Sequence, residues 1–389
     1  MKLKSVLILL FFCFLNRVAG QNPVYEWAHA IGTNTASYAC GTCIKTDAAG
    51  NVYLSGYFRG ALDVDPSAGV FNITSYDAST DFFVAKYNST GVLQWAKSIG
   101  GAQTDECTSL AIDNLGNVLL TGNFRGTVDL DPGPGVSSYS VAPFTTDIFF
   151  EKLDPNGNFI WVRTISNNNQ KRSYSIIADQ NNDIIITGYF TGVVDFDPGP
   201  STVSYTSTSA ELFFLAKYDS NGNYNWVDVG QQYSGKSIGR SLVCDNNNNI
   251  FLGGHYSGKL DFDPSANVDT LTAFGGNLDI FFAKYDAAGN FVFVKHATGG
   301  GSDSLNCITL DANKNILIAG HFPGGVVDFD PSPGTAVPIG SSNSTNLFIA
   351  KYDSLGNYFW VFPVGSNVGT NNCRSIVTDA IGNVYATGF

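Results

Sequence analysis

Ten aspartates form five Asp-x-Asp-Pro pairs, which are the residues best suited to bind a ligand. The pairs are Asp63 and Asp65, Asp129 and Asp131, Asp195 and Asp197, Asp261 and Asp263, and Asp328 and Asp330, at intervals of 66, 66, 66 and 67 residues. Paired carboxylates suit Ca²⁺, which takes six to eight oxygen ligands. The pairs lack the Asp-x-Asp-x-Asp-Gly spacing of known calcium loops, so the alternative is that they cap the backbone of a recurrent turn.

A recurrent lysine is a second candidate partner for these aspartates. Alternation in "VVDFDP" puts Val194 and Phe196 on one face of a strand and both aspartates on the other. The "AKYD" motif, which reads "EKLD" once, recurs with the same period and carries Lys86, Lys152, Lys217, Lys284 and Lys351. We therefore predict that each lysine lies within salt-bridge reach of an Asp-x-Asp-Pro aspartate.

Catalytic signatures are absent from the sequence. It contains no His-Glu-x-x-His, Gly-x-Ser-x-Gly or phosphate-binding loop. The four glutamates hold unrelated repeat positions, which disfavours a glutamate pair for glycoside hydrolysis, although aspartates could serve. One repeat position varies, and we expect it to face solvent where a ligand binds; it holds Tyr57, Asn123, Tyr189, His255 and His321.

The cysteines also follow the repeat. Cys43 and Cys307 share one position, and Cys107 and Cys373 share another. Recurrence within apolar runs favours small buried side chains over a disulfide framework. "CGTC" at 40–43 could be a redox or metal pair, but no second such pair accompanies it.

The N-terminus and the charge balance predict an exported acidic protein. Residues 1–20 combine a basic start, a short apolar run and a small-residue end, as a cleaved signal peptide does. Without Lys2, Lys4 and Arg17, 18 basic residues face 33 acidic ones, a net charge of −15. This charge disfavours nucleic acid as a partner. No later segment is long and apolar enough to span a bilayer.

Strand-length apolar runs separated by polar turns fill each period. Two turns per period share the form Asp-x-x-Gly-Asn, as in "DNLGN" at 113–117 and "DPNGN" at 154–158. The aspartate can accept backbone N–H bonds, and the glycine can take positive φ. Four strands joined by hairpins predict either an all-β propeller or a β-solenoid, and the hairpins favour the propeller.

An aromatic residue marks the last strand of every period. The tryptophans are Trp27, Trp95, Trp161, Trp226 and Trp360, and Phe293 fills the remaining copy. A ring at a fixed place in each unit is expected to pack between neighbouring units, with an aromatic glycan platform as the alternative.

The composite "NVYLTGxFxGxVDFDPG…DxFFAKYDxxGNxxWxxxxGG" resembles the SBBP-type β-propeller repeat of secreted and surface bacterial proteins. The resemblance covers about 25–389 and implies export and a propeller. We therefore expect residues 21–389 to form one propeller domain of five complete four-stranded antiparallel units over about 32–365. Residues 25–32 and the C-terminal strands are expected to share a partial closing blade. Because the sequence stops before a sixth Asp-x-Asp-Pro motif, we expect it to be truncated.

Two functions remain open. The first is a monomeric, non-catalytic scaffold that binds or adheres to a protein or glycan outside the cell. The second is a surface enzyme that acts on polysaccharide through a site built from loops. The uniformity of the units favours the scaffold, because a catalytic site normally breaks the repeat at one place.

Overall fold

The computed structural model describes residues 27–32, 38–167, 169–324, 326–338, 344–365 and 369–389, and its fold is all-β. The expected signal peptide at 1–20 lies outside these residues. Two short 3₁₀ turns, η1 (Tyr76–Ala78) and η2 (Phe274–Gly276), interrupt the strands. In the described part of the chain, no helix has the length and apolar character needed to cross a bilayer.

Four-stranded antiparallel meanders follow one another along the chain, and we number them as units. Unit 1 contains β1 (Tyr38–Thr46), β2 (Val52–Arg59), β5 (Thr80–Tyr87) and β6 (Leu93–Gly101). Unit 2 contains β7 (Glu106–Ile112), β8 (Val118–Phe124), β11 (Asp147–Leu153) and β12 (Phe159–Ile165). Unit 3 contains β13 (Lys171–Ala178), β14 (Ile184–Asp195), β15 (Ser204–Tyr218) and β16 (Tyr224–Val229).

The pattern continues through the C-terminal half. Unit 4 contains β18 (Ser237–Cys244), β19 (Ile250–Tyr256), β22 (Asp279–Tyr285) and β23 (Phe291–Gly299). Unit 5 contains β24 (Ser304–Leu310), β25 (Ile316–Phe322), β27 (Asn346–Tyr352) and β28 (Tyr358–Val364), and the pair β29 (Cys373–Thr378) and β30 (Val384–Gly388) begins unit 6. The prediction of an all-β fold of antiparallel sheets is thereby confirmed.

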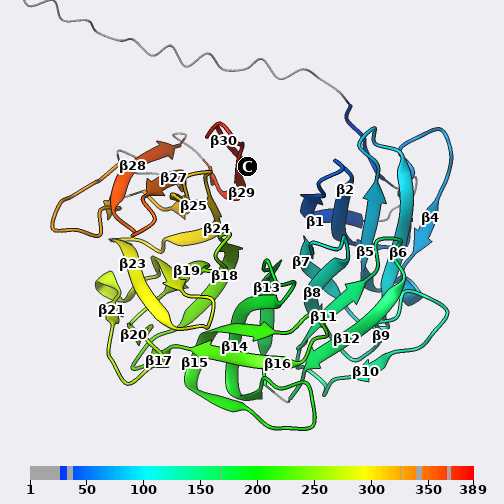
Figure 1. The fold of residues 1–389 in the computed structure, drawn as a ribbon, viewed down its shortest axis with the longest axis horizontal. Coiled ribbons are helices and arrows are strands. Elements are labelled where there is room, and N and C mark those ends of the chain that lie inside the picture. Colours follow the sequence, from blue (N-terminus) through cyan, green and yellow to red (C-terminus); the bar gives the residue numbers. More distant parts are fainter. Residues whose placement is uncertain (1–26, 33–37, 168, 325, 339–343, 366–368) are drawn as a thin grey trace, which may run out of the picture.

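The units are arranged around a common centre, with their first strands innermost (Figure 1). Neighbouring first strands contact one another, as β7 and β13 do. β1–β2 and β29–β30 lie on the two sides of the open part of this arrangement (Figure 1), and no sheet in the described residues joins them. Closure by the segment around Trp27 therefore stays a prediction.

The hydrophobic core lies in the seams between units. Ring pairs cross two of these seams: Phe82 of unit 1 stacks on Phe149 of unit 2 with centroids 4.9 Å apart, and Phe282 of unit 4 lies 4.6 Å from Tyr352 of unit 5. The last-strand aromatic residues add to this packing. The Trp95 indole N–H donates to the Pro155 carbonyl of the next unit at 3.1 Å. The predicted role of these rings between units is confirmed.

The hairpin turns behave as their sequence predicts. In the turn at 113–117, one Asp113 oxygen accepts the N–H groups of Leu115 and Asn117, and the other accepts the Asn117 amide. The fourth turn residue has positive φ, as at Gly116 (+80°) and Gly157 (+76°). The turns therefore need aspartate to accept the backbone N–H groups of the turn, and glycine to adopt positive φ.

Candidate functional site

Each Asp-x-Asp-Pro pair lies in an excursion between the second and third strands of its unit, which we call the arm. Short strand pairs form the arms: β3 (Ala61–Asp63) with β4 (Asn72–Thr74), β9 (Thr127–Asp129) with β10 (Ser138–Ser140), and β20 (Lys259–Asp261) with β21 (Thr270–Thr272). In unit 3, β14 and β15 extend into the arm, and in unit 5 the arm holds β26 (Val327–Asp328).

The arms bridge neighbouring units. β9 pairs with β6 of the preceding unit, and β26 pairs with β23. β20 pairs with β17 (Gln231–Gln232), which follows the last strand of unit 3. The first aspartate of the motif takes part in each of these pairings, through its backbone. The arm is therefore part of the attachment between units.

The aspartate side chains cap the arm backbone in the same way in every unit. In unit 4, one Asp261 oxygen accepts the N–H groups of Asp263 (3.2 Å) and Asp269 (2.9 Å). Asp263 accepts the N–H group of Ser265 at 2.9 Å. The same three bonds recur in the other arms. This geometry supports a structural role for these carboxylates, which is to cap the backbone of the arm turn.

The prediction that the recurrent lysine pairs with an Asp-x-Asp-Pro aspartate is wrong. Lys152 lies 2.9 Å from Asp113, Lys217 2.7 Å from Asp179, and Lys351 2.8 Å from Asp311, all of them aspartates of the first hairpin turn. Lys86 donates to the Pro155 carbonyl of the next unit, and Lys284 lies over the Phe251 ring.

The tyrosine of the same motif reaches the arm instead. Its hydroxyl donates to the carbonyl between the two aspartates, as from Tyr218 to Phe196 at 3.0 Å. The same bond recurs from Tyr87, Tyr285 and Tyr352. Adjacent residues of a strand point to opposite faces, so only one of the pair can contact the arm.

Calcium at the aspartate pairs stays a prediction. Among the described residues, no group of three or more His, Cys, Asp or Glu side chains is placed to hold a metal. In each pair, one oxygen of each carboxylate already accepts backbone N–H groups, which leaves the other oxygen for a cation.

Changing both Asp261 and Asp263 to Asn separates the two interpretations. We expect a loss of about 1–3 kcal/mol in the free energy of unfolding, since charge-assisted bonds to the backbone are weakened. This loss should be equal in calcium and in chelator, as measured by thermal melting. Asp77→Asn, at an exposed site, is the control for the lost charge. A calcium-dependent stabilisation that disappears only in the double variant would establish the pair as a metal site.

The variable strand-end position does not face solvent in all units, contrary to our expectation. His255 is buried, and its Nδ1 lies 2.9 Å from the Ser304 hydroxyl of the next unit. Burial, then the charge of Arg240, lowers the pKa of His255 to about 3. Asn123 is buried too, and its side-chain oxygen accepts the Ser173 N–H. These residues join the second strand of one unit to the first strand of the next.

A different set of variable residues lies along the inner strands. Each first strand has a β-bulge, and the bulged residues are Thr42, Thr108, Tyr174, Arg240, Asn306 and Arg374. Arg240 lies 4.3 Å from the Tyr174 ring centre, and Asn306 donates to the Cys373 carbonyl. We call this set the bulge ring. Its sequence signal is a variable residue mostly flanked by small ones, which the repeat alignment could have revealed.

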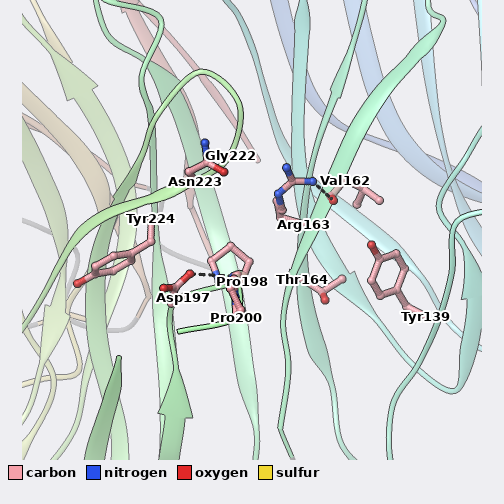
Figure 2. A pocket seen from close by; sticks show the side chains of 11 residues that line it. Tyr139, Val162, Arg163, Thr164, Asp197, Pro198, Pro200, Gly222, Asn223 and Tyr224 are labelled. Carbon is pink, nitrogen blue, oxygen red and sulfur yellow. Dashed lines mark hydrogen bonds between the residues drawn. The ribbon is translucent and has the colours of Figure 1, made fainter. Parts of the chain in front are cut away.

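A pocket of about 490 Å³ lies in the seam between units 2 and 3. Figure 2 shows Asp197 and its neighbouring prolines between Tyr224 on one side and Arg163 and Tyr139 on the other. Arg163 donates to the carbonyls of Val162 and Asn221, and Asp197 accepts the Gly199 N–H. Of the ten predicted aspartates, only Asp197 lines this pocket. Its aromatic, amide and charged groups could bind a small polar ligand.

No disulfide joins the cysteines that the structure describes. The six in the described residues are free thiols, and Cys107, Cys307 and Cys373 are buried. Cys40 is exposed, while Cys43 is half-buried and contacts the Leu110 carbonyl of the next unit. The two "CGTC" thiols therefore differ in burial although they lie on the same strand.

Comparison with known proteins finds distant relatives of part of the chain. A WD repeat-containing protein of Acanthamoeba polyphaga mimivirus is 26% identical over 246 residues, which are 56% of this chain and 17% of that protein. Regulatory protein FlaEY of Caulobacter vibrioides is 24% identical over 313 residues, which are 69% of this chain and 32% of that protein. The chain therefore spans a third or less of these relatives.

Among solved structures, BamB from Moraxella catarrhalis aligns with 92% of this chain and 99% of its own, at 11% identity and a TM-score of 0.30. Residues 94–123 match the model of the SBBP family, described as a beta-propeller repeat. This stretch covers most of β6 and runs through β7 into β8, so it crosses the first seam. The chain therefore carries the SBBP beta-propeller repeat that its sequence predicts.

Proposed function

We propose that this protein is an extracellular, non-catalytic binding scaffold whose contact surface is the bulge ring. The observation that carries the proposal is the contrast between positions in the repeat. Turn aspartates, arm aspartates and seam aromatics recur because they hold the units together, whereas the bulge ring changes from Thr to Tyr, Arg and Asn. Variation at one ring of otherwise constant units is what a recognition surface requires.

The charge and chemistry of the ring indicate the kind of ligand. Arg240 and Arg374 are cationic in a chain of net charge −12, and Arg172 lies on the same inner strand as Tyr174. Arginine and tyrosine are enriched in binding surfaces because they offer area and hydrogen bonds at low entropic cost. We infer an acidic glycan or an acidic peptide segment as the ligand. One relative is described as a WD repeat-containing protein, which is consistent with an interaction role.

The proposal is tested by probing residues 21–389 with printed arrays of neutral and acidic glycans and of acidic peptides. We expect binding to an acidic probe that falls about tenfold or more when Tyr174 and Arg240 are both changed to Ser. Arg163→Ser, in the seam pocket of Figure 2, is the matched control and should bind as the parent does. Loss of binding only in Arg163→Ser would move the site to that pocket. Release of new reducing ends from a polysaccharide would favour the enzyme instead.

A further inference from the structure

A backbone contact recurs where the third strand of one unit meets the first strand of the next. The Asp105 N–H donates to the Thr80 carbonyl at 2.8 Å, the Asp303 N–H to Leu278 at 2.7 Å, and the Asn371 N–H to Thr345 at 3.1 Å. The contact places together the side chains that we call the seam pairs: Asp81 with Asp105, Asp147 with Lys171, Asp279 with Asp303, and Asn346 with Asn371. The repeat thus provides four versions of one site in the seams.

Two of the seam pairs have no net charge. Lys171 is fully buried and lies 2.5 Å from Asp147. Its ammonium also donates to the Asn167 and Asn169 carbonyls, both at 3.1 Å, and to the Asn167 side-chain oxygen at 2.8 Å. The Asn346–Asn371 pair is neutral because the amide side chain of asparagine does not ionise. Each of the two pairs of aspartates, in contrast, would carry a charge of −2 if both of its carboxyl groups were ionised.

The two acidic seam pairs differ in their hydrogen bonds. Asp105 accepts the N–H groups of Gly101 (2.7 Å) and Arg125 (3.2 Å), so both of its oxygens have partners. Asp303 is 0% exposed, and neither of its oxygens has a hydrogen-bond partner in the described part of the chain. A buried carboxylate without partners is rare and indicates a missing ligand or a bound proton.

We propose that Asp279 and Asp303 bind a divalent cation, with Ca²⁺ as the best fit, at the place where the Lys171 ammonium lies in the equivalent seam. A double positive charge restores the neutrality that the other seam pairs have. Asp279 already accepts the N–H groups of Phe274 and Gly299, so the two unpartnered oxygens of this pair are those of Asp303. Ca²⁺ takes six to eight oxygen ligands. Gly299 and Gly301 hold the chain positions of Asn167 and Asn169, whose carbonyls bind the ammonium, and water completes the set.

The competing state is a shared proton. Burial, followed by the charge of Asp279, raises the pKa of Asp303 to about 8. A proton shared by the two carboxyl groups is therefore the alternative to a bound cation, and a cation must displace it. This site is distinct from the Asp-x-Asp-Pro pairs, whose carboxylates cap the arms.

The test is thermal melting of residues 21–389 in CaCl₂, MgCl₂ and EDTA, with calcium titration calorimetry. We expect calcium to raise the melting temperature by several degrees, because it binds only the folded state. Asp303→Asn should abolish both the rise and the calorimetric signal. Asp303→Lys, which copies Lys171, should melt at the temperature of the calcium-loaded parent whether or not calcium is present.

Two variants make the result specific to this seam. Asp105→Asn, at the acidic seam pair whose oxygens have partners, should keep the calcium response, as should the double change of Asp261 and Asp263 to Asn. The proposal is overturned if the parent shows no calcium response and Asp303→Asn is as stable as the parent, which is the behaviour of a protonated pair. It is also overturned if Asp303→Asn keeps the calorimetric signal. None of these outcomes depends on the bulge ring binding a ligand.

Discussion

Replacing Glu151 by Ala together with Leu153 by Tyr is expected to stabilise the protein by about 3 kcal/mol at pH 8. Glu151 is fully buried, and in the described part of the chain its two carboxyl oxygens have no hydrogen-bond partner. The other units have Ala at this position and Tyr two residues later, as in Ala216 and Tyr218. The double change therefore removes an unsatisfied acid and restores the tyrosine that donates to the arm carbonyl.

The effect should depend on pH in a defined direction. Burial, then the charge of Asp131, raises the pKa of Glu151 well above its usual value. The folded protein thus keeps this proton at a pH where the unfolded chain has lost it. The part of the cost that comes from ionisation is therefore absent below about pH 4 and grows as the pH rises. Denaturant melts of parent and double variant at pH 4 and pH 8 measure this difference. An equal gain at both pH values would show that the ionisation of Glu151 does not contribute to the loss of stability.

The second large effect is expected at Gly157, where a turn of unit 2 lies under a ring of unit 1. Its φ is +76°, and a Cβ there would lie 2.8 Å from the Trp95 ring. Gly157→Ala should therefore cost about 1–2 kcal/mol for the left-handed backbone and about 1–3 kcal/mol more for overpacking. Denaturant unfolding measures the sum.

Gly116 provides the matched control for this prediction. It has nearly the same φ (+80°) in the inner turn of the same unit, and its Cβ would meet Pro155 at an ordinary 3.5 Å. Gly116→Ala should cost only the backbone part. If the two variants lose the same free energy of unfolding, the aromatic residues of the last strands are not tightly packed against the turns of the next unit.

The sequence predicted those features that depend on a single local rule. Asp113 caps its turn and Trp95 fills a seam because each role requires one residue type at one repeat position. The prediction of a salt bridge between the lysine and the arm was wrong for a physical reason. The period shows that Lys217 and Asp195 recur together, but only the strand faces show that Tyr218, and not Lys217, contacts the arm. The repeat period alone does not show on which face of its strand a side chain lies.

The candidate site was harder to predict because it depends on contacts between units. The burial of His255 requires Ser304 of the next unit, about 50 residues away in the chain. The bulge ring requires an irregularity of register that strand alternation does not reveal, as at Arg240. The isolated charge of Asp303 is visible only beside Asp279, because the same position holds Lys171 in another seam.

The account holds that the Asp-x-Asp-Pro carboxylates are structural caps, and hydrogen exchange in the unit 2 arm tests this most directly. There, Asp129 accepts the N–H groups of Asp131 (3.1 Å) and Ser137 (2.8 Å). The account predicts that both amides exchange slowly, equally so in calcium and in EDTA, and that Asp129→Asn accelerates both. Rapid exchange in EDTA with protection restored by calcium would contradict it, because the arm would then be held by a metal ion.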